Sequence, residues 1–466
     1  MDDTPRIHHR LLPERPHQSL DDYLTDGGGR GLAGARAIGP QATIHDVTAS
    51  GIRGRGGAGF PVGVKWRSVS TAGGPRRYAV ANGAEGEPGT FKDRPLLRTN
   101  PYAVIEGLLI SAFAIGASDA YLAVKASFTT EIDALRRALA EVEAAGWLGD
   151  ITVTLATGPE EYLFGEEKAL LEVIEGNEPL PRWLPPYLHG LFATAPQLGW
   201  ESSEVDPDDP ATQGSNPTLV NNVESLAQVA WMMNHGVEEF RSVGTDESPG
   251  TLLVNVVGDV TKPMVAEVEM GTPLVDVIAM AGGVAEGRRV KAVFSGVANA
   301  VLPGSLIDTP LTYEHLAAAG SGLGAGGFIV YDDSACMVEV ATTMSRFLWV
   351  ESCGQCPPCK LGTGAITSVL ERIRTGKGSD DDLGIIERRL QVVTDGNRCY
   401  LPVQEQTLVA SILRAFPEDV AAHLEGFCPS QRAEIRIPKV VDLVDGEVVW
   451  DERQALKRPD WTYADD

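Results

Sequence analysis

A run of three closely spaced cysteines constrains this chain more than any other feature. Cys353, Cys356 and Cys359 follow a C-x₂-C-x₂-C spacing in the segment ESCGQCPPCKLG, and Cys399 lies forty positions further on. Three thiolates held in a small volume by a reversing loop, with one remote thiolate, are the ligand set of a [4Fe-4S] cluster. A structural zinc site usually divides its cysteines into two C-x₂-C pairs or adds histidines, and none stands near these four. Zinc and unmetallated thiols remain the alternatives.

The rest of the composition is that of a globular protein in a reducing compartment. At 466 residues, with 43% hydrophobic and 22% charged residues, the chain has room for two to four domains. Six cysteines are too few for a disulfide scaffold. The net charge of −25 disfavours non-specific binding of nucleic acid or anionic membranes. Cys336 and Cys428 lack a comparable spacing, and we expect both to be small buried hydrophobic residues.

Neither a membrane span nor a signal segment is expected. The longest near-apolar stretch, Val104 to Ala117, contains Glu106 and is too short to cross a bilayer as a helix. The N-terminus, MDDTPRIHHR, has no apolar signal core. We therefore expect a cytoplasmic protein, either free or peripheral to a membrane complex.

Local patterns divide the chain into five segments. Strand-like runs at 78–80 and 120–124 alternate with a helical pattern over 131–145, which favours an α/β sheet. Strand-like runs at 251–257 and 265–268 with a short helix indicate a small α+β module, and helical signals fill 337–424. Asp445-Gly446 between two β-rich runs predicts a hairpin. The expected segments are a leader with little core of its own (1–45), an α/β domain (46–248), an α+β domain (249–333), a helical domain (334–425) and a tail (426–466).

The segment GIRGRGGAGFP contains a literal G-x-G-x-x-G at Gly54, Gly56 and Gly59. A Rossmann fingerprint should follow a strand and open a helix, and no buried-strand run precedes this one, so we reject that assignment. Dense glycines still let backbone N–H groups and a flat ring approach closely. Arg55 and Lys65 place cations beside the loop, which suits a phosphate; a flexible surface turn is the alternative.

Three further segments carry polar groups at expected element ends. Asn82 to Gly89 follows a strand signal, and Tyr162 to Glu167 precedes a helical run. Carboxylates beside glycines at strand ends suit ribose hydroxyls or ring N–H groups, although each segment alone is more often a solvated turn. Asn221-Asn222 opens the helical pattern Val223 to Met233. A helix N-terminus binds phosphate readily, whereas Asn there is commonly only a cap.

Taken together, these motifs resemble one family. GIRGRGGAGFPVGVKW, EGEPGTFKDR, Tyr162 to Glu167, Asn221-Asn222 and ESCGQCPPCKLG occur in the order found in the NADH-oxidising flavoprotein subunit of respiratory complex I. The diaphorase-type subunits of NAD-linked hydrogenases and formate dehydrogenases are similar. The resemblance runs from about residue 45 to residue 420. It implies an α/β flavin domain, an SLBB-type β-grasp domain and a helical bundle that holds the cluster.

The resemblance also implies a site. FMN would be held by Gly54, Arg55, Lys65, Asn82, Gly165, Glu166, Asn221, Asn222 and Ser225, with Gly56, Gly57, Gly59 and Glu85 beside them. NADH would lie over the flavin near Phe60, Glu87, Tyr162 and Glu167, with Tyr187 available to stack on adenine. Glu87, Tyr162 and Glu167 are the candidate catalytic residues. The implied activity is hydride transfer from NADH to FMN, then single electrons to the [4Fe-4S] cluster.

Departures from the family pattern mark a divergent member. Ala84 stands where Asp is usual, Phe164 where Cys is usual, Lys168 for Thr, Leu184 for a basic residue and Lys360 for Arg. The alternatives are therefore a different electron donor, or a structural subunit that only holds a cluster. The implied partners are a thioredoxin-like [2Fe-2S] subunit and a larger redox subunit. Pro185 to Pro217 and Ile435 to Trp450 are candidate docking surfaces, with a plain surface insertion as the alternative.

Overall fold

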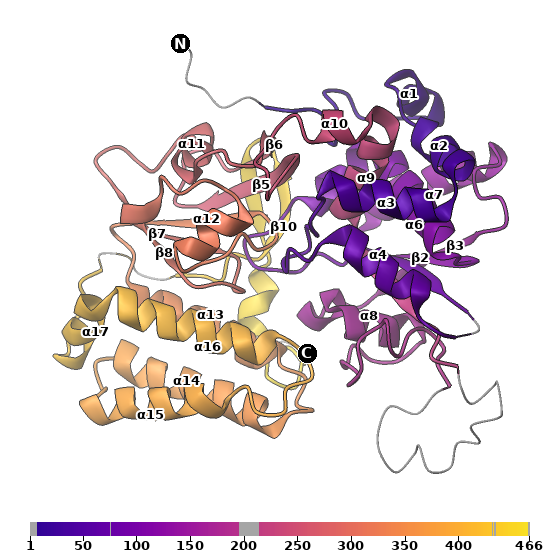
Figure 1. Cartoon of the computed structure of the whole chain (residues 1–466). Coiled ribbons are helices and arrows are strands. Elements are labelled where there is room, and N and C mark those ends of the chain that lie inside the picture. Colours follow the sequence, from indigo (N-terminus) through magenta and orange to yellow (C-terminus); the bar gives the residue numbers. More distant parts are fainter. Residues whose placement is uncertain (1–6, 75, 195–213, 431, 433–434, 465–466) are drawn as a thin grey trace.

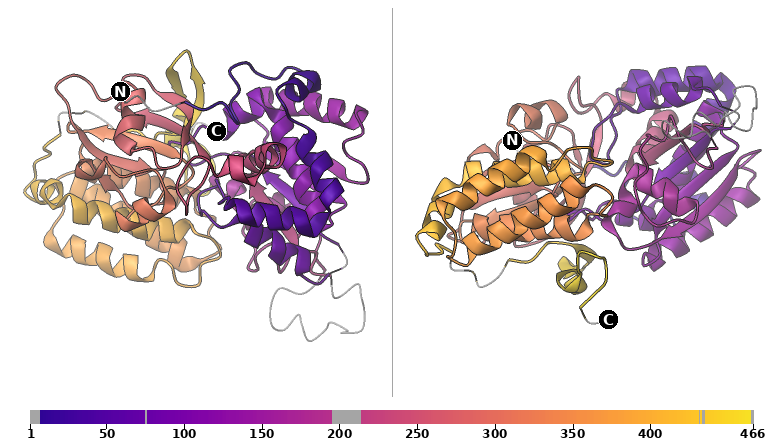
Figure 2. Two further views of the ribbon diagram at one scale, coloured as in Figure 1. Left: turned by 45° about the horizontal axis from the view of Figure 1, so that its top comes forward. Right: turned by 90° about the horizontal axis from the view of Figure 1, so that it is seen from below.

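The computed structural model describes residues 7–74, 76–194, 214–430, 432 and 435–464. The chain forms two lobes: an α/β lobe from its first half, and a second lobe in which a sheet lies against a helical bundle (Figure 1). Two other views show the same division, with the C-terminal segment between the lobes (Figure 2). Within the described ranges, each helix is too short or too polar to span a membrane.

The first domain is built on four parallel strands. They are β1 (Tyr78–Asn82), β2 (Asp119–Lys125), β3 (Thr152–Gly158) and β4 (Thr218–Asn222), arranged in the order β3-β2-β1-β4. Side chains alternate along β1, so that Ala79 and Ala81 join one core and Tyr78 and Val80 another. The strands predicted at 78–80 and 120–124 are confirmed.

Helices cover both faces of this sheet. One face packs against α4 (Val62–Thr71), α6 (Pro101–Ile115), α7 (Thr129–Ala144) and α9 (Val223–His235), and the short helices α5 (Asp93–Thr99) and α10 (Val237–Phe240) flank them. The other face packs against the 3₁₀ turn η1 (Tyr162–Gly165) and α8 (Glu167–Ile174). Helix α6 is central because it is apolar nearly all round, with Glu106 as its one charged residue.

The N-terminal segment is more structured than its composition suggests. It forms α1 (Leu20–Thr25), α2 (Arg30–Ile38) and α3 (Pro40–Ser50), and Leu11, Tyr23 and Leu32 are buried in the core of the first domain. The Tyr23 hydroxyl donates a 2.6 Å hydrogen bond to buried Glu106. The expectation of little core was wrong for residues 8–45, because the sparse apolar side chains here pack on α6 and α9 of the first domain.

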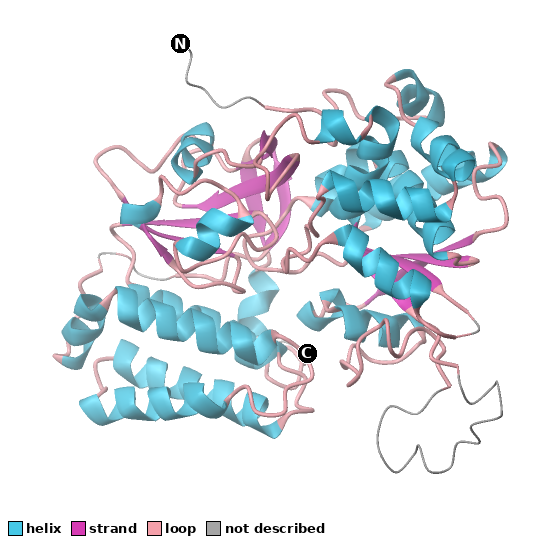
Figure 3. Ribbon diagram, viewed as in Figure 1, coloured by secondary structure: helices cyan, strands magenta, loops and turns pink. Residues whose placement is uncertain are grey.

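The second domain is a mixed five-stranded sheet. It contains β5 (Thr251–Gly258), β6 (Met264–Glu269), β7 (Val290–Ser295), β8 (Leu302–Pro303) and β9 (Gly327–Asp332), in the order β6-β5-β9-β7-β8. The β5–β9 pair is parallel and the other pairs are antiparallel. Helices α11 (Leu274–Met280) and α12 (Tyr313–Ala318) and the turn η3 (Gly304–Leu306) complete it. Figure 3 separates this strand-bearing part from the all-helical bundle.

The bundle and the tail make up the remainder. The bundle comprises α13 (Met337–Glu351), α14 (Pro357–Arg374), α15 (Asp380–Val392), α16 (Leu401–Ala415) and α17 (Pro417–Leu424). The tail forms the predicted hairpin, β10 (Val440–Val444) and β11 (Glu447–Trp450), then η4 (Glu452–Leu456). Asp445 and Gly446 both have positive φ, as a tight hairpin turn requires.

The tail fastens the two lobes together. Arg98 of the first domain pairs with Asp442 of the hairpin at 2.8 Å. Lys457 pairs at 2.9 Å with Glu351 at the end of α13, and neither side chain is exposed. Glu351 also accepts a 3.1 Å hydrogen bond from the backbone N–H of Tyr162. The hairpin predicted as a docking surface is therefore used, at least in part, within the chain.

Candidate functional site

The carboxyl ends of the parallel strands gather most of the predicted segments. Asn82 and Asn222 end β1 and β4 and are direct neighbours in the ladder. Strand β1 pairs with β2 on one side and β4 on the other, so the order of the sheet reverses here. Ligands of open α/β sheets bind at such a reversal, beyond the carboxyl ends of the strands. The sheet thus places the site independently of the motifs.

The glycine loop lies on this edge. The backbone N–H of Arg55 donates a 2.8 Å hydrogen bond to Ser225 Oγ in α9. A Cβ at Gly56 would lie 3.1 Å from Cβ of Asn222, so the loop packs closely on the end of β4. Gly57 has φ +122°, and a Cβ added there would meet none of the described protein atoms within 4 Å, which leaves its outer face open to a flat ligand. Helix α3, not a strand, precedes the loop, in agreement with the rejection of a Rossmann fingerprint.

Arg55 is the clearest correction to the sequence-based site. Its guanidinium is 1% exposed and donates to the Thr251 carbonyl at 3.0 Å and the Tyr313 hydroxyl at 3.1 Å. It lies 3.8 Å from the buried carboxylate of Glu224. Burial beside an opposite charge holds the side chain in the interior, so it does not offer a cation to a phosphate at the loop surface. Only the backbone of Arg55 belongs to the loop.

The two strand-end asparagines position other segments. Asn82 Nδ2 donates to the Gly165 carbonyl at 2.8 Å, which ties β1 to η1. Asn222 Nδ2 donates to Asp93 at 2.7 Å, while its Oδ1 caps α9. The amide oxygen of Asn221 accepts from the indole N–H of Trp66 at 2.9 Å. Asp93 was missed by the sequence analysis although it lies in EGEPGTFKDR.

Glu85 supplies an unsatisfied polar atom. Its Oε1 accepts the backbone N–H groups of Lys92 at 2.8 Å and Asp93 at 3.1 Å. Its Oε2 is buried and has no hydrogen-bond partner among the described residues. Burial, helped by the charge of Asp93, raises the pKa of Glu85 to about 7. A buried acceptor without a protein partner at a strand end suits an N–H or hydroxyl group of a ligand.

Glu87 and Tyr162 form one unit. The Tyr162 hydroxyl donates to Oε2 of Glu87 and accepts from Gln404 Nε2 at 2.7 Å. Oε1 of Glu87 accepts the N–H of Val297 at 2.7 Å, from the second domain. Burial raises the pKa of the Glu87 carboxyl, and the hydrogen bond from Tyr162 opposes that rise. The first and second domains therefore meet at this carboxylate, and the helical domain reaches it through Gln404 and the Tyr162 hydroxyl.

The remaining carboxylates stand at the start of α8. Glu167 pairs with Lys65 at 2.7 Å, and both side chains are partly exposed, so this cation remains close to the surface of the site. Glu166 caps α8 by accepting the N–H groups of Lys168 and Ala169, each at 2.9 Å. Burial raises the pKa of Glu166 to about 7. The structure thus places Glu167 against Lys65, which lies in helix α4, directly after the glycine loop.

Two predicted residues stand apart from these contacts. Phe60 is 53% exposed and Tyr187 is 43% exposed, so each could cover a ligand but neither is fixed by the protein. Most of the predicted docking loop, including Trp200 to Pro210, lies outside the described residues. The family departures have structural explanations in part: Phe164 is fully buried, and the ammonium of Lys168 donates to the Arg398 carbonyl.

The four predicted cysteines line one cavity. Cys353, Cys356, Cys359 and Cys399 share it with Leu163. Among the described residues, no three of these four sulfurs lie within 4.8 Å of one another. Three neighbouring thiolates and one remote thiolate around one cavity are the ligand set of a [4Fe-4S] cluster. Burial and the neighbouring sulfurs raise the pKa of Cys359 to about 12, and iron would hold it deprotonated.

The turn from Tyr162 to Glu167 connects the two sites. Leu163 lines the cysteine cavity, while the adjacent Tyr162 bonds Glu87. The charge of Glu166 acts on Cys399, which places the cap of α8 near the fourth cysteine. Gln355 Nε2 also donates to the Pro181 carbonyl at 3.2 Å, across the same boundary. One short segment therefore separates the carboxyl edge of the first sheet from the cysteines.

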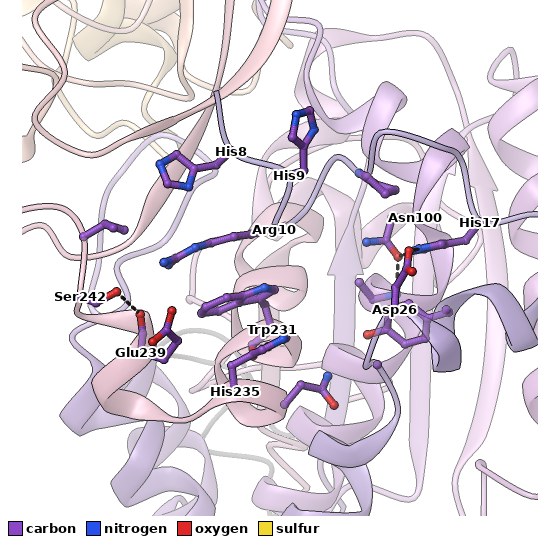
Figure 4. A pocket seen from close by; sticks show the side chains of 16 residues that line it. His8, His9, Arg10, His17, Asp26, Asn100, Trp231, His235, Glu239 and Ser242 are labelled. Atoms are coloured by element: carbon purple, nitrogen blue, oxygen red, sulfur yellow. Dashed lines mark hydrogen bonds and ion pairs between the residues drawn. The ribbon is translucent and has the colours of Figure 1, made fainter. Parts of the chain in front are cut away.

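A second cavity, of about 430 Å³, lies among the N-terminal residues and α9 (Figure 4). Its labelled histidines are engaged: His8 contacts Glu269 at 2.8 Å and His17 contacts Asp26 at 2.8 Å. His235 stacks on Trp231 with ring centroids 4.2 Å apart, and Arg10 lies over the same indole. This cavity shares no lining residue with the predicted site.

Comparison with known proteins agrees with this geometry. Three family models match: the Nuo51 FMN-binding domain at residues 47–231, the SLBB domain at 253–295, and the NADH-ubiquinone oxidoreductase-F iron-sulfur binding region at 339–423. An NADH-quinone oxidoreductase F subunit of Rhizobium meliloti is 38% identical over 421 residues, which cover 87% of this chain and 94% of that protein. The F subunit of Streptomyces coelicolor is 36% identical, covering 89% and 90%. A solved NAD⁺-reducing [NiFe]-hydrogenase in the air-oxidized state superposes with a TM-score of 0.73 and 32% identity, covering 88% of this chain and 67% of that one.

The fold and the two sites define an electron-transfer flavoprotein with an iron–sulfur cluster. The chain belongs to the family of NADH-quinone oxidoreductase F subunits. The family resemblance, the FMN and [4Fe-4S] cofactors, and the order of α/β, SLBB-like and helical parts are thereby confirmed.

Proposed function

We propose that this chain oxidises NADH at the edge of the first sheet and delivers electrons to the cysteine cavity. The observation that carries the proposal is the turn at 162–167, which touches Glu87 with one residue and the cysteine cavity with the next. When bound, FMN accepts a hydride and releases its two electrons singly, and the [4Fe-4S] cluster takes one electron at a time. The protein aligns these groups and excludes water between them.

Individual residues have distinct proposed roles. The open backbone of residues 54–59 receives the flavin ring, and the free oxygen of Glu85 accepts a hydrogen bond from it. Lys65 is a nearby cation that remains partly exposed, so it suits the flavin phosphate when Glu167 releases it. Glu87, held from both sides, presents a fixed carboxylate to the dinucleotide. Phe60 and Tyr187 are exposed rings available to stack on its bases.

A test separates this function from the alternatives. Protein purified without oxygen is analysed for flavin and iron, then assayed for ferricyanide reduction with NADH, NADPH or formate. We expect FMN, iron and a preference for NADH. Activity with another donor alone would support the second enzyme hypothesis, and cluster without flavin would support a purely structural subunit.

We further propose that the chain works within a multi-subunit redox complex. A thioredoxin-like [2Fe-2S] subunit and a larger redox subunit are the partners we expect. Leu361 and Tyr400 closely follow cluster positions in the sequence and are 70% and 58% exposed, so an apolar surface lies beside the cysteines. Large exposed apolar side chains at such a place favour contact with another chain. Affinity purification from native cells should recover another redox subunit, and a solitary protein with full turnover on a natural acceptor would contradict this.

The domain boundaries are part of the same proposal. We place them at 248/249, 333/334 and 425/426. The expected boundary at 45/46 falls inside helix α3 and is dropped, because α1–α3 pack on the first domain. Limited proteolysis should cut near these positions before it cuts within β5, whose side chains are almost all buried.

A further inference from the structure

Two cysteines and a histidine outside the cluster site meet at the other end of helix α13. Cys336 is the residue just before α13, His423 lies in the last turn of α17, and Cys428 follows that helix. Their ligand atoms all lie within 4.8 Å of one another, with Cys336 Sγ 3.1 Å from His423 Nε2. The 15-residue α13 separates this group from the cluster loop by about 22 Å, at about 1.5 Å rise per residue.

The three side chains differ in burial. Cys336 is fully buried and His423 is 2% exposed, whereas Cys428 is exposed. The expectation that both cysteines are buried hydrophobes was therefore wrong for Cys428. The group of Cys336, His423 and Cys428 thus combines two buried side chains with a third at the surface. The sequence region that matches the iron-sulfur family model spans 339–423, so both cysteines lie outside it.

The imidazole is held in the orientation that a metal ligand needs. Backbone carbonyls of Ile373 and Arg374, at the end of α14, accept hydrogen bonds from the ring. Because Nε2 faces Cys336, the nitrogen that donates to these carbonyls is Nδ1. A proton fixed on Nδ1 leaves the lone pair of Nε2 directed at the two sulfurs. This is the usual second contact of a metal-binding histidine.

The local charge also suits a cation. Asp419 is 4% exposed, and its carboxylate accepts from the Met337 N–H at 2.8 Å and Lys291 at 2.7 Å. Its negative charge acts on both Cys336 and His423.

We propose that Cys336, His423 and Cys428 bind one zinc ion, with a water molecule in the fourth position. Thiolate and imidazole ligands select zinc among the abundant divalent ions, and a Cys₂His set leaves one open position in a tetrahedral site. Binding releases the two thiol protons to solvent, and no electron is transferred. The ion would fasten the segment after α17 to the start of α13, just before the chain leaves the bundle for the tail.

Metal analysis of the whole protein tests this. Holoprotein purified without oxygen is incubated with a small excess of zinc chloride, passed over a chelating resin and analysed for zinc and iron. We expect about one zinc beside about four iron atoms per chain. Cys428→Ser changes an exposed residue, so it should keep the fold and the iron. Zinc should fall at least about tenfold, because the loss of even an outer partner of a metal ligand costs about that much affinity. His423→Gln should behave alike, and His235→Gln, on the other lobe, should keep the zinc.

Two results would overturn the proposal. One is a wild-type protein, full in iron, that retains no more zinc than Cys428→Ser. The other is an intact mass lower by about 2 Da in zinc-free protein, with peptide mapping that joins Cys336 to Cys428, because the pair would then form a redox-active disulfide instead.

Discussion

Tyr162 donates its hydroxyl hydrogen to Oε2 of Glu87 while its own oxygen accepts from Gln404. Gln404 lies in α16, which begins two residues after Cys399. These two hydrogen bonds therefore connect the acidic segment after β1 with helix α16, which lies next to Cys399 in the sequence. The backbone N–H of Tyr162 is held as well, by Glu351, which is paired with Lys457 of the tail.

Replacing Tyr162 with Phe should shift the pH dependence of NADH oxidation. The variant keeps the ring against Phe347 but loses both hydroxyl contacts. Because that hydrogen bond opposes the rise in the pKa of Glu87, its loss should raise the pKa further. A hydrogen bond to a charged group contributes about 1.5–3 kcal/mol, so the acidic limb of kcat/KM should move up by about one pH unit. Tyr400→Phe, at an exposed tyrosine, is the control. An unchanged profile would show that Glu87 does not titrate in the reaction.

Glu405 should make the folded protein less stable as the pH rises. Burial raises its pKa from 4.5 to about 8, and a 2.6 Å hydrogen bond from Ser345 only partly offsets that rise. The unfolded chain releases this proton near pH 4.5, whereas the folded state keeps it until about pH 8, so stability falls between these two pH values.

The substitution Glu405→Gln keeps an acceptor for Ser345 and removes the titration. Relative to wild type, it should raise the free energy of unfolding by roughly 2–4 kcal/mol at pH 8 and by little at pH 5. Thermal unfolding at both pH values measures this, with the exposed Glu418→Gln as control. Equal effects at the two pH values would exclude a raised pKa at Glu405.

Gly57→Val should lose FMN without losing the fold. None of the described protein atoms lies within 4 Å of the added Cβ, so the substitution meets open space where the flavin ring should lie. Its φ of +122° adds backbone strain, so FMN affinity should fall at least about tenfold. Gly34→Ala is a matched control, because its Cβ also meets open space but lies in α2 with ordinary helical backbone. Equal FMN contents in the two variants would count against the loop's role.

Cys356→Ser should lose most of the iron. Anaerobically purified wild type should contain about four iron atoms per chain with matching acid-labile sulfide. Cys356 caps α14 at the rim of the cysteine cavity, so its loss opens the cluster to solvent. Stoichiometric zinc at this cavity with no sulfide would refute the cluster assignment.

Local spacing predicted much of the fold and the site. The cysteine triplet and the Asp445-Gly446 turn are short-range features, so their structures follow from neighbouring residues. Two strands of each sheet, β1 and β2 in the first and β5 and β6 in the second, were also predicted from their apolar runs. The remaining strands, such as β3, whose last residue alone is buried, were not. The structure also pairs Glu87 with Tyr162, two residues that the resemblance placed near the dinucleotide, and their catalytic role stays a prediction.

Long-range burial accounts for what the sequence did not predict. The direction of Arg55 depends on Glu224 and Thr251, which come from α9 and β5. The meeting of Cys336 with His423 joins residues 87 positions apart. In each case a buried group takes the partner that satisfies it, and that partner is chosen by packing between elements rather than by nearby sequence.

An anaerobic titration of the purified holoprotein with NADH tests the central claim most directly. Visible absorbance follows the flavin, and electron paramagnetic resonance follows the cluster. We predict that about one NADH per chain bleaches the flavin, and that a reduced [4Fe-4S] signal appears in the same titration. A protein that contains both cofactors, is reduced by dithionite, and shows no spectral change with NADH would contradict the account.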